Sequence, residues 1–186
     1  MYWIIVVSNI RRYQKYVKVM IYMIKNRTCC FLGHRKINRS ERMVSNLTDI
    51  IENLIVEEKI DTFLFGSKSE FNTLCLEVVA MLKKKYPYIK RIYVRAEFPY
   101  IDNNYKEYLL EFYEDTYYPK QILNAGKAVY IKRNYEMINN SSWCVTYYDE
   151  NYMPFTRNDK NAQSNSGTKI AYDYAMKKGI KIINIF

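Results

Sequence analysis

The sequence contains a single histidine, His34, and its four cysteines include no pair in C-x-x-C spacing. This shortage of ligands argues against a zinc site, and we expect no bound metal or other cofactor. The cysteines lie in apolar stretches, and Cys29 and Cys30 are adjacent on a predicted strand, where neighbouring side chains point to opposite faces. The pattern predicts four buried free thiols in a reducing compartment, so we expect a cytoplasmic protein.

No apolar run in the chain reaches the roughly 20 residues that a membrane-spanning helix requires. The run over residues 1–7 is too short, and basic residues interrupt the later runs of the amino-terminal segment. The positive charge also follows the apolar run, which reverses the order found in a secretory signal peptide. We therefore expect no transmembrane segment.

Acidic side chains are absent from residues 1–27, which hold six basic ones. Without that segment the net charge of +10 falls to +4, because 23 basic and 19 acidic residues remain. The body is thus mildly basic, which suits a local anion site more than a surface that coats nucleic acid. Three interpretations of residues 1–27 stay open: a basic amphipathic element on a membrane or partner, an extra element packed on the domain, or translation from an upstream start codon, with Met20 or Met23 as the usual start. We favour an accessory segment followed by one domain over residues 28–186.

The length of 186 residues and the hydrophobic content of 49% predict a domain with a substantial core. From Thr28 onward, short apolar runs alternate with helical periodicity. We expect strands, or short extended pieces, at residues 28–32, 61–65, 89–96, 128–131, 143–148 and 180–186. Helices are expected between them, the first capped by Asn38 and the last starting near Gly167. This alternation predicts an α/β fold, a Rossmann-like three-layer sandwich with a mostly parallel sheet.

Two turns at the carboxyl ends of the first two strands lie where open parallel sheets bind ligands. The first contains Gly33, His34 and Arg35. Arg35 could recognise a phosphate, or it could be an ordinary surface arginine. We favour a binding or structural role for His34 over acid–base catalysis. In the second, Gly66 would let a phosphate or sugar approach the backbone. The same turn supplies Ser67 and a weak catalytic candidate, Glu70, although a carboxylate is also stabilised at any helix start.

A third turn precedes the last helix and contains Ser166, Gly167 and Thr168. Its N–H and hydroxyl groups offer a phosphate site, while Ser166 is equally a standard helix cap. Arg133 and Asn134 would contribute from the fourth strand, or would form a solvated helix start. The long polar stretch over residues 149–166 is typical of a lid or binding loop.

In this order, the turns resemble those of the SLOG family, Rossmann-like domains related to the DNA-processing protein A core and to the LOG cytokinin-activating phosphoribohydrolases. The resemblance is greatest to the bacterial YpsA-like branch and spans roughly residues 28–186. The matching stretches are residues 29–35, 62–66, 70–72, 118–119, 132–134, 166–168, 171–175 and 177–184. The family implies binding of nucleotides or nucleotide-derived ligands, either as a sensor or as an enzyme.

The chain departs from the LOG enzymes, which carry a P-G-G-x-G-T-x-x-E turn. Only Gly167 and Thr168 remain of its core, and Ala171 stands at the position of the catalytic glutamate. The leading hypothesis is therefore binding or sensing of a nucleotide-like small molecule. The alternatives are a LOG-type hydrolase that uses Glu70, and single-stranded nucleic-acid binding by tyrosines near basic residues. The small positive charge of the domain makes nucleic acid an unfavoured ligand but does not exclude it. The 20 tyrosines are also compatible with an interface in a homo-oligomer.

Overall fold

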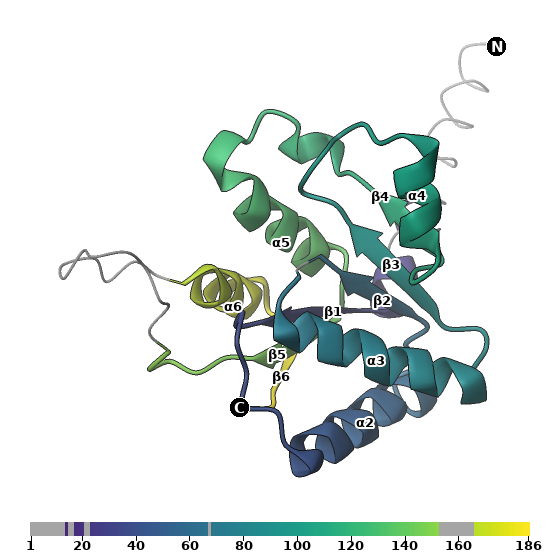
Figure 1. The fold of residues 1–186 in the computed structure, drawn as a ribbon, viewed down its shortest axis with the longest axis vertical. Helices are drawn as coiled ribbons and strands as arrows, with labels where there is room; N and C mark the ends of the chain where they lie inside the picture. The colour runs from purple at the N-terminus through teal and green to yellow at the C-terminus, as the bar shows by residue number, and fades with distance from the viewer. Residues whose placement is uncertain (1–13, 15–16, 21–22, 67, 153–165) are drawn as a thin grey trace, which may run out of the picture.

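The structure, a computed structural model, describes residues 14, 17–20, 23–66, 68–152 and 166–186 (Figure 1). None of the helices in these ranges is both long and apolar enough to cross a membrane. The elements are β1 (Thr28–Gly33), α2 (Glu41–Val56), β2 (Thr62–Phe65), α3 (Glu70–Lys85), β3 (Lys90–Val94), α4 (Asn103–Leu110), β4 (Asp115–Tyr117), η1 (Lys120–Ile122), η2 (Gly126–Ala128), α5 (Val129–Asn139), β5 (Trp143–Tyr147), α6 (Gly167–Lys178) and β6 (Lys181–Asn184).

The described strands form one parallel sheet in the order β4-β3-β2-β1-β5-β6. The chain builds outward from β1 to β4 and then returns to place β5 on the other side of β1. The direction of winding therefore reverses between β1 and β5, and such a switch point opens a crevice at the carboxyl ends of the strands. The predicted Rossmann-like α/β fold is confirmed, and every strand pair in the described part of the chain is parallel.

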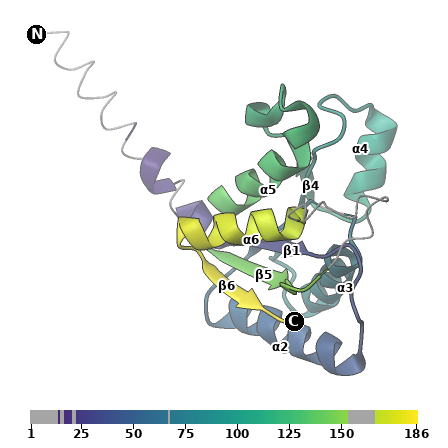
Figure 2. The ribbon, with the colours of Figure 1, turned by 90° about the vertical axis from the view of Figure 1, so that its left-hand side faces the viewer.

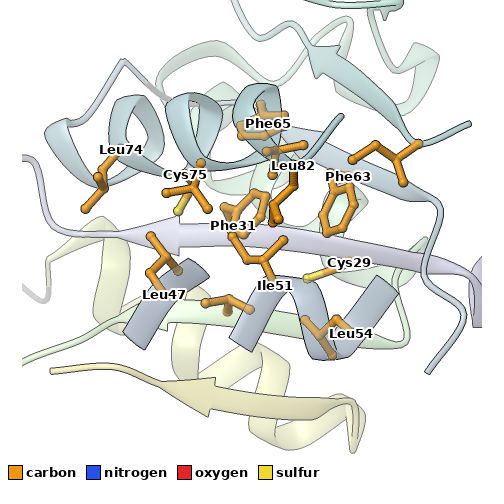
Figure 3. Close-up of a cluster of buried hydrophobic side chains, with 14 of the residues drawn as sticks. Cys29, Phe31, Leu47, Ile51, Leu54, Phe63, Phe65, Leu74, Cys75 and Leu82 are labelled. Carbon is orange, nitrogen blue, oxygen red and sulfur yellow. The ribbon is translucent and has the colours of Figure 1, made fainter. Parts of the chain in front are cut away.

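Helices cover both faces of this sheet, with α2 and α3 on one side and α5 and α6 on the other (Figures 1 and 2). Because side chains alternate along a strand, Cys29 and Phe31 of β1 pack toward α2 and α3 (Figure 3), whereas Cys30 and Leu32 belong to the cluster on the opposite face. All four cysteines are buried and free, as predicted. The central strand is thus enclosed on both faces, which fixes its carboxyl end in place.

Side-chain caps set the starts of the helices that flank the switch point. The hydroxyl of Ser69 accepts a hydrogen bond from the Asn72 N–H at 3.2 Å and starts α3, and Ser166 starts α6 in the same way. The predicted cap of α2, Asn38, was wrong: Ser40 Oγ accepts from the Met43 N–H at 3.2 Å instead. Only Ser40 directly precedes the helix, since α2 starts at Glu41 and so leaves Asn38 outside the first turn.

The predicted strand or extended piece at residues 128–131 was also wrong. These residues end η2 and begin α5, and the fourth strand is the short β4, over residues 115–117. The β-branched and aromatic run after Ala128 favours a strand by propensity alone. Burial of Met137 and Ile138 against the sheet stabilises the helix and overrides that preference. Arg133 therefore lies inside a helix and not at the end of a strand.

Gly33 closes β1 against the start of α3, and a Cβ there would overlap the ring of Phe71. We expect Gly33→Ala to lower the free energy of unfolding by about 1–3 kcal/mol, as overpacked cores do. Urea denaturation checks this, with Gly167→Ala as the control, because among the described residues a Cβ there would meet no atom within 4 Å beyond its chain neighbours and its own helix backbone. Equal stability of the two variants would contradict the assigned packing.

Candidate functional site

A cleft of about 790 Å³ opens at the carboxyl ends of the central strands. Its walls come from the end of β1, the turn after β2, the starts of α3 and α6, and the first turns of α5. Most of the residues predicted to bind a ligand line it together: Gly33, His34, Arg35, Gly66, Arg133, Asn134, Ser166, Gly167 and Thr168. The fold thus brings the three turns to one place, as their positions after parallel strands require. Ligand binding by these residues stays a prediction.

Two predicted site residues are not among those that line the cleft. Ser67 lies outside the described residues. Glu70 is described but does not line the cleft; its Oε1 lies 2.5 Å from Lys36 Nζ, and its Oε2 accepts from the Ile37 N–H at 3.1 Å. The hydrogen bond from Lys36 lowers the pKa of Glu70. A general acid needs a raised pKa, so this geometry does not favour a catalytic Glu70.

Arg133 on α5 is the most buried charge in the cleft wall, with 2% of its surface exposed. Its Nη1 donates to Val94 O at 3.1 Å, and its Nε donates to Asn134 Oδ1 at 3.0 Å. No carboxylate among the described residues forms an ion pair with it. Burial lowers the pKa of Arg133, but an arginine stays protonated in proteins. The alternative of a solvated helix start is therefore wrong for Arg133, because its side chain is buried beside the backbone of Gly66 and Val94.

Gly66 makes room for that guanidinium. A Cβ at Gly66 would lie 2.5 Å from Arg133 Nη1 and 2.6 Å from Met137 Sδ, closer than packed atoms approach. The sequence suggested that this glycine admits a ligand to the backbone. In the structure, side chains of α5 fill the space beside Gly66. The missing side chain of Gly66 therefore leaves room for the Arg133 guanidinium and not for a ligand.

The start of α6 supplies a second attraction for an anion. Ser166 Oγ accepts from the Lys169 N–H at 3.1 Å, and Ser166 O accepts from the Ile170 N–H at 3.0 Å. The N–H groups of Gly167 and Thr168 have no hydrogen-bond partner among the described residues. Both residues line the cleft, and the space beside Gly167 is open. A helix start with free N–H groups favours negative charge.

His34 and Asn72 each leave one buried polar atom in the cleft wall without a partner in the described part of the chain. His34 Nε2 lies 2.9 Å from Asp149 N and 3.1 Å from Asp149 O, whereas Nδ1 contacts no polar group. The Asn72 amide donates to Ser69 Oγ at 3.2 Å and leaves Oδ1 unpaired. Buried polar atoms are nearly always hydrogen-bonded, so these two atoms are places for groups of a ligand or for water.

Sequence reasoning missed several residues of the cleft wall. Asn72 occurs in the stretch that carries the family resemblance, yet it was not assigned to the site. Glu97 follows the carboxyl end of β3, a position that could have singled it out. Tyr152 stacks on His34 with ring centroids 3.9 Å apart, and only the folded chain shows this contact. No three His, Cys, Asp or Glu side chains of the described ranges are grouped so that they could hold a metal ion.

Neither a scan against protein-family models nor a search of curated proteins finds a match to this chain. Membership of the SLOG family therefore stays a prediction. Function has to be inferred from the chemistry of the cleft.

His34 should titrate at an unusually low pH. Burial lowers the pKa of its imidazole from 6.5, so the unfolded chain takes up this proton before the folded protein does. The resulting loss of stability sets in as the pH falls through 6.5 and is complete below the folded pKa. Because His34 is the sole histidine, its ring protons give an isolated NMR titration. A midpoint at or above 6.5 in the ligand-free protein would contradict the assigned environment.

Proposed function

We propose that this protein binds a nucleotide or nucleotide-derived small molecule, whose phosphate lies between Arg133 and the start of α6. The observation that carries the proposal is the buried guanidinium, which forms no ion pair with any carboxylate of the described residues. Removing an ion from water costs several kcal/mol unless an opposite charge compensates it. A phosphate in the cleft would supply that charge, and the planar guanidinium suits its geometry.

The remaining charges of the cleft support an anionic ligand. Arg35 and Lys68 also line it, as does Lys36, whose charge is paired with Glu70, and Glu97 is the single acid among the described lining residues. The free N–H groups at the start of α6 add their partial positive charge to this wall. The electrostatic potential in the cleft therefore mostly favours the binding of an anion.

Size and shape support a ligand larger than a free phosphate. A volume of about 790 Å³ falls in the range of sites for drug-sized molecules, which is about 300–1,000 Å³. Tyr130, half-exposed on α5, and Tyr152, stacked on His34, provide flat aromatic surfaces in the same cleft. Such surfaces suit a base or another planar group.

Binding is better supported than LOG-type hydrolysis. Ala171 lines the cleft at the position where the LOG turn has its glutamate, and it offers no acid or base. Glu70 is held outside by Lys36. Tyr108, the exposed aromatic side chain of α4, does not favour nucleic-acid binding, because the exposed charges beside it, Lys106 and Glu107, have opposite signs.

Replacing Arg133 by methionine should abolish stabilisation by nucleotides. Wild-type protein should gain about 2.7 kcal/mol of stability when a ligand is present at 100 times its dissociation constant. We expect Arg133→Met to lose this gain yet fold with similar stability, since the variant keeps the side-chain volume and removes a costly buried charge. Thermal unfolding with AMP, ADP-ribose and dinucleotides measures the gain.

Lys132→Met is the matched control, because it removes the neighbouring positive charge from an exposed position. It should retain nearly all of the stabilisation. An undiminished shift in folded Arg133→Met protein, or no shift with any of these compounds in the wild type, would contradict the proposed function.

A further inference from the structure

The turn after β3 holds its backbone in an unfavourable conformation. Phe98 has a φ of 50°, which costs a bulky residue about 1–3 kcal/mol. The strain does not serve to bury the aromatic ring, because 64% of the Phe98 surface is exposed. Buried Arg95 holds the turn, since its Nη1 donates to Phe98 O at 2.7 Å and its backbone N–H donates to Tyr117 O at 2.8 Å. This rigid turn fixes the position of the preceding residue, Glu97, in the wall of the cleft.

Glu97 is half-buried and has no hydrogen bond or ion pair with any residue that the structure describes. Its carboxylate offers about four acceptor sites and no donor. The other charged side chains that line the cleft are basic, and a carboxylate among them opposes the binding of an anion. It favours binding only where the ligand presents hydrogen-bond donors, such as hydroxyl groups, beside its negative charge.

We propose that Glu97 forms the sugar subsite of the cleft and accepts hydrogen bonds from the ribose hydroxyls of the ligand. This rests on the proposed function and narrows it: the cleft selects phosphorylated ribose over its 2-deoxy counterpart. A carboxylate at a strand end recognises ribose hydroxyls in dinucleotide sites of parallel sheets. Here the carboxylate follows the third strand, and it lines the same cleft as the start of α6.

The position of Glu97 favours the sugar over the base. Glu97 comes three residues after Val94, whose carbonyl oxygen accepts a hydrogen bond from Arg133 Nη1, so Glu97 and Arg133 line neighbouring parts of the cleft wall. A group held by Glu97 is therefore close to the phosphate held by Arg133. In a nucleotide the ribose is bonded directly to the phosphate, whereas the base is one unit further away.

Calorimetric titration with two matched pairs of ligands tests this assignment. The pairs are ribose 5-phosphate with 2-deoxyribose 5-phosphate, and AMP with 2′-deoxy-AMP. Wild-type protein should bind the ribose member of each pair about tenfold more tightly or better, the ratio expected for one hydrogen bond to a charged group. Glu97→Gln keeps an acceptor oxygen but removes its charge, so it should lower both ratios severalfold, because a hydrogen bond to a neutral group is weaker than one to a charged group. Glu107→Gln, which removes a charge from exposed α4, should leave both ratios unchanged.

Three results would overturn the assignment. The first is an equal affinity of wild-type protein for ribose and deoxyribose compounds. The second is an equal effect of Glu97→Gln on both members of a pair, and the third is an effect confined to AMP and 2′-deoxy-AMP, which would assign Glu97 to the base. If binding is lost in Arg133→Met while the ribose preference is absent, the sugar subsite alone fails. If none of the four compounds binds, the sugar subsite fails as stated, and the proposed function fails with it only when ADP-ribose and the dinucleotides do not bind either.

Discussion

A buried guanidinium without a carboxylate partner is the constraint on which the described cleft depends. Arg133 reaches its position only because α5 begins at Val129 and Gly66 carries no side chain. Val94 O at the end of β3 then anchors one end of the guanidinium. A buried charge without an ion pair lowers stability, and in the proposed function the anionic ligand offsets that cost.

Opposite charges divide the cleft into two parts. Arg133 and the start of α6 form the part suited to a phosphate, and Glu97 forms the part suited to hydroxyl groups. Other local departures from normal structure border the same space: the unpaired Nδ1 of His34, the unpaired Oδ1 of Asn72, and the strained turn that carries Glu97. Unpaired buried polar atoms and strained backbone lower stability, and in proteins they occur most often at functional sites.

Periodicity and turn patterns were enough to predict the mostly parallel sheet, the cap at Ser166, and the meeting of three turns at one edge. They failed where tertiary contacts decide the outcome. The β-branched run after Ala128 became helical because its continuation is buried against the sheet. Burial of Arg133, and the reason for glycine at position 66, depend on a contact between segments distant in the chain. The sequence around Glu97 shows no motif apart from its position after a strand. Only the folded chain shows that Glu97 lines the cleft.

A crystal structure of the protein with bound AMP would test the central claim most directly. The account predicts that a phosphate oxygen lies about 2.7–2.9 Å from a guanidinium nitrogen of Arg133, as in other charge-assisted contacts. A second phosphate oxygen should accept a hydrogen bond from the N–H of Gly167 or Thr168. A phosphate bound only by the lysines at the mouth of the cleft, with Arg133 still lacking an anionic partner, would contradict the account.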